Sequence, residues 1–241
     1  MAHSEGLHFK TVVLDAGHGG KDFGASSADK RTHEKNINLD VALRLKKLIN
    51  EAAPDVKVVM TRSTDVFVPL ADRAEIANKA NANLFISIHV NSYFRTAPHG
   101  SSVHVLGQSS RQDRDLFAFN QEICRRENSV IYLENDYTTR YEGFDPSDEE
   151  SLIFMTLMQS AYLEQSIRFA EIVDKNMKAT GPFSFSRGLS QDPFFVLWKT
   201  AMPAVLVELG FLSNAADLAV LRDGSNLEKI AKSLLSAFLE Y

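Results

Sequence analysis

The stretch "VVLDAGHGGKD", residues 12–22, starts as an apolar strand and breaks into glycines around a single histidine. Gly17, Gly19 and Gly20 surround His18. Glycine lets the backbone turn tightly and approach another group closely. We therefore interpret the stretch as a strand-end turn that brings His18 into a site. The simpler alternative, a tight turn with an incidental histidine, stays open at this point.

Short apolar runs alternate with longer helical patterns along the chain. This alternation is typical of an α/β fold, and runs that are apolar on both sides indicate a sheet covered on both faces. We predict a central, mostly parallel, twisted sheet of about six strands flanked by helices on both faces. The expected strands are 11–16, 56–61, 84–90, 101–106, 193–197 and 204–210, and the expected helices are 36–52, 69–81 and 226–241.

Residues 107–190 do not follow the alternation and are predicted to form a helical insertion. A long helix is expected over 151–179, with Ser147 and Glu150 as a capping box at its start. The insertion is too short for a core of its own, so residues 11–241 are expected to form a single domain. Residues 1–10 are interpreted as an extension or as a start that replaces a removed leader, because they lack the apolar core of a signal peptide.

Composition excludes several classes of protein. The net charge of -5 gives no reason to expect a nucleic-acid partner. The single cysteine, Cys124, excludes an internal disulfide. The sequence contains no run of eighteen apolar residues, so no transmembrane segment is predicted. Neither glycine pattern of the nucleotide-binding loops fits residues 12–22, because Asp15 and Asp22 stand where a glycine is required.

Titratable side chains stand at or just beyond the carboxyl ends of three predicted strands. His18 follows the first strand, His89 is the next-to-last residue of "LFISIHV", and Glu208 ends "AVLVE". If these strands are parallel, their carboxyl ends share one edge of the sheet, where ligands bind in α/β folds. The period of two also places Ser87 and Asn91 on the face that carries His89. We therefore expect these distant residues to meet in one site.

Two imidazoles and a carboxylate are a ligand set typical of a catalytic zinc, which binds three protein groups and leaves one position open. Glu34, at the start of a predicted helix, is the best third ligand, and its neighbour His33 is the alternative. Glu208 suits the role of general base and then general acid. Ser87 and Asn91 are expected either to orient a ligand or bind substrate, or only to satisfy the strand end.

Several motifs occurring in order make the chain resemble a known family. They are "VVLDAGHGGKDFGA", "EKNINLDVALRLKKLI", "TRSTDVFVPLADRAEIAN", "ISIHVNS" and "RGLSQDPFFVLWKTAMPAVLVELGFLSN". Together they resemble the zinc-dependent N-acetylmuramoyl-L-alanine amidases of the amidase_3 type, from residue 11 to about 240 apart from the middle of the insertion.

The resemblance implies one zinc ion, with His18, Glu34 and His89 as its ligands and Glu208 as the catalytic residue. It implies hydrolysis of the amide between N-acetylmuramic acid and L-alanine of the peptidoglycan stem peptide. It also implies work outside the cytoplasm, in the periplasm or the cell wall, in processes such as cell division. Two rival functions stay open: a wall-binding module without activity, and a zinc peptidase that cuts within the stem peptide.

Some amidases of this type carry a helical segment that blocks the zinc until a partner displaces it, and the insertion stands where such a segment would. An activator protein is therefore an expected partner besides peptidoglycan. Acidic residues of the insertion are candidates for the blocking ligand, although helix starts also favour acidic residues. The insertion's aromatic residues Tyr137, Tyr141 and Phe144 are alternatively expected to line a groove for substrate. The acidic candidates are Glu142, Asp148, Glu149 and Glu150.

Overall fold

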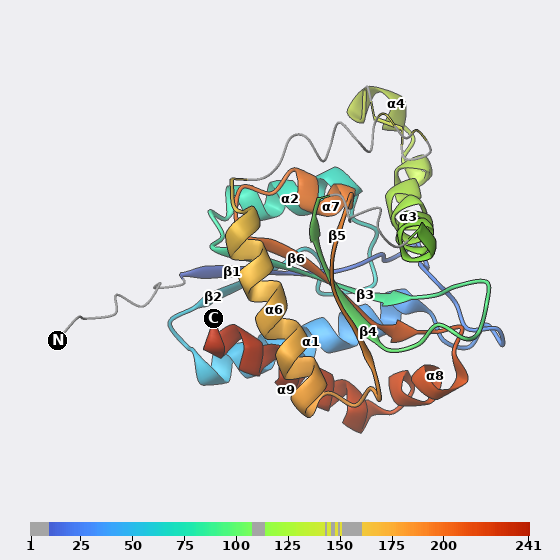
Figure 1. Ribbon diagram of the computed structural model, residues 1–241. Helices are drawn as coiled ribbons and strands as arrows, with labels where there is room; N and C mark the ends of the chain where they lie inside the picture. Colours follow the sequence, from blue (N-terminus) through green and yellow to red (C-terminus); the bar gives the residue numbers. More distant parts are fainter. Residues whose placement is uncertain (1–9, 108–113, 143, 146–147, 149, 151–160) are drawn as a thin grey trace.

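The computed structural model describes residues 10–107, 114–142, 144–145, 148, 150 and 161–241. Six strands form one sheet in the order β2-β1-β3-β6-β4-β5 (Figure 1). Every neighbouring pair is parallel except β4 and β6, which are antiparallel. The predicted mostly parallel α/β sheet is confirmed. Its strands are β1 Thr11–Ala16, β2 Lys57–Met60, β3 Leu84–Asn91, β4 Ser101–Leu106, β5 Ser186–Asp192 and β6 Ala204–Phe211.

Helices cover both faces of the sheet. One apolar cluster packs α1 (Glu34–Ala52), α6 (Leu163–Thr180) and α9 (Gly224–Glu240) against one face. A second cluster packs α2 (Leu70–Lys79), α3 (Arg114–Asn128) and α7 (Phe195–Trp198) against the other face. The remaining helical elements of the described part are η1 Ser129–Leu133, α4 Tyr137–Arg140 and α8 Ala215–Leu221. No helix in that part is long and apolar enough to cross a membrane.

One predicted strand is wrong. Residues 193–197 were expected to form a strand, but Phe195–Trp198 form the short helix α7. The strand of this region is β5, Ser186–Asp192, whose sequence "SRGLSQD" is largely polar and half-buried. As the edge strand of the sheet, β5 needs few apolar side chains. The apolar run after it fills the second core cluster instead.

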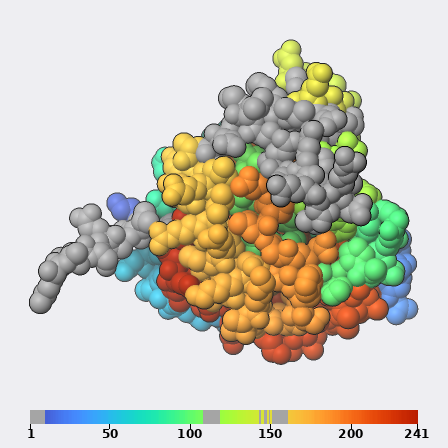
Figure 2. All heavy atoms as spheres, viewed as in Figure 1, coloured from blue at the N-terminus to red at the C-terminus, as the bar shows by residue number. Residues whose placement is uncertain are grey.

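The insertion between β4 and β5 packs on both faces of the sheet, through α6 and α3, and part of it projects from one end of the domain. Its described part contains α3, η1, α4 and α6. Figures 1 and 2 show α4 projecting from the end of the molecule that lies opposite α8 and α9. Helix α6 covers the sheet over residues 163–180, and residues 151–160, predicted to begin this helix, lie outside the described part.

The order of the central strands decides where the site lies. β1, β3 and β6 are adjacent and parallel, so their carboxyl ends meet at one edge of the sheet. His89 and Glu208 are direct register partners on β3 and β6. The predicted convergence of residues from three distant segments therefore follows from the topology.

Candidate metal centre

The glycine-rich turn after β1 is shaped by its contact with β3. The backbone N–H of Gly17 donates to the carbonyl oxygen of Ile88 at 3.0 Å. A Cβ on Gly17 would lie 2.4 Å from the imidazole of His89, so only glycine fits there. His18 itself has a positive φ of 61°, in the left-handed region that non-glycine residues rarely adopt. The turn therefore brings the two imidazoles together, with ring centroids 4.9 Å apart.

A buried ion pair between α2 and β1 fixes this turn. Arg73 of α2 pairs with Asp15 at 2.7 Å and donates to the carbonyl oxygens of Ala16 and His18, both at 2.9 Å. Burial alone would raise the pKa of Asp15, but Arg73 and the hydroxyl of Ser87 hold that pKa below its ordinary value. Arg73 thus anchors both helix α2 and the turn.

Glu34 is fixed by backbone donors on both sides of its carboxylate. Its Oε2 accepts from the N–H of Ala25 at 2.8 Å, and its Oε1 accepts from the N–H of Val90 at 2.9 Å. Oε1 also lies 3.1 Å from Nε2 of His18 and 3.1 Å from Nδ1 of His89. The side chain is fully buried. Glu34 therefore presents one oxygen between two imidazoles in a fixed position.

His33, the alternative third ligand, lies outside this cluster. Its Nδ1 is 2.8 Å from the hydroxyl of Ser26, and its ring packs against Phe23. The structure thus brings together His18, Glu34 and His89.

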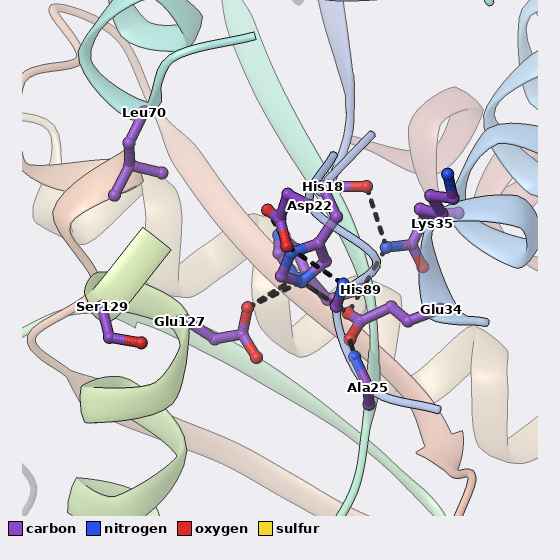
Figure 3. A network of polar contacts seen from close by, with 12 residues as sticks. His18, Asp22, Ala25, Glu34, Lys35, Leu70, His89, Glu127 and Ser129 are labelled. Carbon is purple, nitrogen blue, oxygen red and sulfur yellow. Dashed lines mark hydrogen bonds and ion pairs between the residues drawn. The ribbon is translucent and has the colours of Figure 1, made fainter. Parts of the chain in front are cut away.

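A fourth residue, Glu127 at the end of α3, completes the cluster and was not anticipated from the sequence. Its Oε2 lies 2.9 Å from Nε2 of His18 and 3.2 Å from Nδ1 of His89. Figure 3 shows Glu127 reaching from its helix toward the two histidines. Ligand atoms of His18, Glu34, His89 and Glu127 all lie within 4.8 Å of one another, and all four side chains are buried.

The acidic residues expected to block the site lie elsewhere. Glu142, Asp148 and Glu150 are exposed, and none of them belongs to the cluster. Glu149 lies outside the described residues. Within the insertion, it is Glu127, 15 residues before Glu142, whose carboxylate meets the histidines.

The cluster fits a metal ion better than it fits hydrogen bonds alone. Nε2 of His18 and Oε2 of Glu127 face each other at 2.9 Å without the geometry of a hydrogen bond, and neither atom has another hydrogen-bond partner among the described residues. Buried polar atoms are seldom left in this state unless an ion or water satisfies them. Burial lowers the pKa of an imidazole, yet the carboxylates of Glu127 and Glu34 raise the pKa of His89 to about 9. The same excess of negative charge favours a cation in place of that proton.

Asp22 orients His18 from behind. Its Oδ2 lies 2.7 Å from Nδ1 of His18, and its Oδ1 accepts from the N–H of Gly24. A carboxylate on the second ring nitrogen fixes the tautomer in which Nε2 is free to bind a metal. Figure 3 shows Asp22 beside the histidine pair. In the sequence, the only local sign of this role is that Asp22 follows His18 by four residues within the glycine-rich turn.

Glu208 lies beside the cluster but does not belong to it. The side chain is fully buried, and neither carboxylate oxygen has a hydrogen-bond partner in the described part of the chain. Burial, and then the carboxylates of Glu127 and Glu34, raise the pKa of Glu208 to about 8. A carboxyl group with a raised pKa next to a metal cluster is suited to exchange protons near neutral pH.

Ser87 and Asn91 are both fully buried and contact protein groups. The hydroxyl of Ser87 donates to Asp15 at 2.6 Å. Oδ1 of Asn91 accepts from the N–H of Ser92 at 2.8 Å. In this structure both residues support the carboxyl end of β3, and neither presents surface to a substrate.

Comparisons with known proteins identify the family to which the chain is similar. A family model described as N-acetylmuramoyl-L-alanine amidase, Amidase_3, matches residues 12–240. The chain is 31% identical over 230 residues to the N-acetylmuramoyl-L-alanine amidase AmiC of Escherichia coli O6:H1, covering 95% of this chain and 52% of AmiC. It is 29% identical to AmiA of Escherichia coli K12, covering 96% of this chain and 76% of AmiA. The chain thus spans about half of the first of these relatives.

Solved structures show the same fold. The catalytic domain of CwlV, an N-acetylmuramoyl-L-alanine amidase from Bacillus (Paenibacillus) polymyxa, superimposes with a TM-score of 0.69 at 28% identity, covering 96% of this chain and 97% of that one. An amidase from Clostridium difficile 630 has a TM-score of 0.71 at 22% identity, covering 97% and 96%, which supports the fold alone. With the family model spanning nearly all its residues, the chain belongs to the Amidase_3 family of N-acetylmuramoyl-L-alanine amidases.

Proposed function

We propose that residues 11–241 form a single zinc-dependent amidase domain. It hydrolyses the amide between N-acetylmuramic acid and L-alanine of the peptidoglycan stem peptide, and His18, Glu34 and His89 hold the zinc. The observation that carries the proposal is the spacing of the donor atoms. Ligands about 2.0–2.1 Å from a tetrahedral zinc lie about 3.3 Å apart. The four measured separations from His18 and His89 to the two carboxylates lie between 2.9 and 3.2 Å.

When bound, zinc supplies a Lewis acid for the amide carbonyl and lowers the pKa of water to about 7. The rest of the chemistry belongs to Glu208. Its unpartnered carboxylate accepts a proton from the attacking water and then delivers it to the leaving nitrogen of L-alanine. The buried setting that raises the pKa of Glu208 favours the protonated form that the second step needs.

We propose further that Glu127 holds the domain in an inhibited state. A catalytic zinc site binds three protein groups and keeps one position for water or substrate. Glu127 would take that fourth position, because its Oε2 lies as close to the histidines as Oε1 of Glu34 does. Activity then requires α3 to move and to withdraw Glu127. An activator protein that binds the insertion is the kind of partner that would move it.

A permanently four-coordinate structural zinc is the second candidate, since structural sites bind four protein groups. The partnerless carboxylate of Glu208 favours catalysis, because a purely structural site gives no reason to bury an unpaired acid beside the cluster. Membership of the amidase family supports peptidoglycan as substrate and a location outside the cytoplasm, in the periplasm or the cell wall.

The proposal is tested by digesting purified peptidoglycan and measuring the masses of the products. Products that separate N-acetylmuramic acid from L-alanine support the amidase. A cut inside the stem peptide would indicate the peptidase, and binding without products would indicate the wall-binding module. Glu208→Gln should retain zinc and lose activity by about 10²- to 10⁴-fold. Glu171→Gln, an exposed substitution on α6, is the matched control.

A further inference from the structure

Arg187 is a half-buried cation without a polar partner. It has no hydrogen bond or ion pair within the part of the chain that the structure describes. Its guanidinium instead stacks on two aromatic rings, 4.6 Å from the ring centre of Phe119 and 5.8 Å from that of Phe211. Burial lowers the pKa of Arg187, and no nearby acid opposes this shift. An arginine buried in this way loses hydration without gaining a counter-charge.

The register of the sheet places Arg187 in line with the catalytic residues. His89 pairs with Glu208, and Glu208 pairs with Ser102. Ser101 pairs with Ser186 and Val103 with Leu189, so Arg187 and Gly188 both lie opposite Ser102 in a bulge of β5. Bulges commonly re-aim a side chain next to an active site. His89, Glu208, Ser102 and Arg187 thus form one row across four neighbouring strands.

The row also gives the approximate distance between the proposed metal site and Arg187. His89 and Arg187 are separated by three strand spacings, or about 14 Å between backbones at about 4.8 Å per spacing. The long arginine side chain covers part of this distance. A peptide extending from the scissile bond advances about 3.3–3.6 Å per residue, so its second and third residues come within reach of the guanidinium.

We infer that Arg187 binds a carboxylate in the peptide part of the substrate, an inference that rests on the proposed function. In that substrate the lactyl carboxyl group is consumed in the amide that is cut, so free carboxylates lie on the peptide side. A guanidinium matches a carboxylate with two parallel hydrogen bonds, and rings stacked on its faces leave its N–H edge available.

Phe119 links this site to α3. It lies eight residues before Glu127 on the same helix, and its ring is one of the two that cover Arg187. Withdrawal of α3 would therefore remove Glu127 from the metal cluster and uncover Arg187 in one movement. Phe211 on β6 would remain beneath the guanidinium and keep it oriented.

The test compares two soluble substrates in each variant. One is a disaccharide–tetrapeptide fragment with free carboxylates, and the other is the same fragment with those carboxylates converted to amides. The ratio of kcat/KM values for the two fragments cancels any effect of α3 docking that is common to both. The ratio is measured in the parent chain and in a Glu127→Gln background, whose metal site is open under the proposed function.

The free fragment should be preferred by about tenfold to a hundredfold, mainly through KM, as for a hydrogen-bonded charge pair. Arg187→Gln should bring the ratio close to one by lowering kcat/KM for the free fragment relative to the amidated fragment. Arg187→Lys, which keeps the charge but not the paired N–H groups, should give an intermediate ratio. The control is Arg168→Gln on the exposed side of α6, with no change expected.

Three results would overturn the inference: no preference in the parent chain, a preference that survives Arg187→Gln, or an equal loss on both fragments. The last would mark Arg187 as structural, and Arg187→Lys would then show the same equal loss. If neither fragment is cleaved by any variant, including the Glu127→Gln background, the proposed function fails, and the inference fails with it.

Discussion

The proposed metal site is built from two regions that hold their side chains in different ways. His18, Glu34 and His89 come from the sheet edge, where Glu34 accepts two backbone N–H groups. Glu127 comes from the insertion, where, among the described residues, its Oε1 meets only the guanidinium of the neighbouring Arg126, at 2.6 Å. The first region belongs to the central sheet, and the second packs on one face of that sheet through the second apolar cluster.

Several polar contacts dock the segment, among them one from Asn120 to the hydroxyl of Ser190 and an ion pair between Arg140 and Asp72. Arg126 donates to the carbonyl oxygen of Ser92, and Asn128 bonds to Pro193 and Phe195. Beyond α3, Glu134 accepts from the N–H of Leu70 at the start of α2. A ligand on the sheet edge can be removed only by disturbing the central strands, whereas Glu127 would leave with α3, whose Phe119, Ile123 and Cys124 would have to leave the second apolar cluster. This difference supports the proposal that His18, Glu34 and His89 bind the metal and that Glu127 regulates it.

The largest effect is expected from removing a ligand of the sheet edge. His89→Ala leaves two of the three proposed zinc ligands, so the chain should lose zinc and all measurable hydrolysis. Zinc per chain after dialysis against a chelator is the measurement. His99→Ala, an exposed histidine outside the cluster, is the control. Full zinc content in the His89→Ala chain would remove His89 from the ligand set.

A smaller effect is expected from changing Asp22, which orients a proposed zinc ligand but does not itself bind the zinc. Asp22→Asn keeps the size of the side chain but removes the negative charge on Nδ1 of His18. Zinc affinity should fall by about 10- to 100-fold, as for other carboxylates that orient a metal-bound histidine. Competition with a chromophoric chelator measures the change. Asp29→Asn, an exposed acid of the same loop region, should leave the affinity unaltered; an equal fall there would argue against an orienting role.

The smallest effect is expected at the far end of the docked segment. The hydroxyl of Tyr141 donates to Glu134 at 2.7 Å and accepts from the N–H of Ala71 at 3.0 Å. Tyr141→Phe should cost about 1 kcal/mol of docking free energy, which is about fivefold in an equilibrium constant. Basal hydrolysis should therefore rise a few-fold.

Tyr137→Phe on the same segment is its matched control, since the Tyr137 ring packs on Tyr132 while its hydroxyl has no hydrogen bond in the described part. A rise of the same size in both variants would show that the hydroxyl of Tyr141 does not dock the segment.

Local sequence patterns predicted the sheet and the meeting of His18, His89 and Glu208, because strand polarity and order are enough to bring these residues together. The same patterns failed at β5. "SRGLSQD" lacks an apolar face because an edge strand does not require one, and "PFFVL" resembles a buried strand although it packs as a helix.

Glu127 could not be predicted in the same way. In "CRREN" it looks like one more charge on a solvated helix face, and nothing local indicates that this turn of α3 faces the metal cluster. Its role depends on how the insertion docks, which is a long-range contact. The sequence instead points to acidic residues just before the predicted helix 151–179. Acidic residues are also favoured at a helix start for reasons unrelated to metal binding.

The contrast between Glu34 and Glu127 is the central claim, and one paired measurement tests it most directly. Zinc content and peptidoglycan hydrolysis are measured on the same samples of Glu34→Gln and Glu127→Gln. The account predicts opposite signs: Glu34→Gln loses zinc and activity together, whereas Glu127→Gln retains zinc and hydrolyses faster than the parent chain. A Glu127→Gln chain that loses zinc and activity in parallel would contradict it.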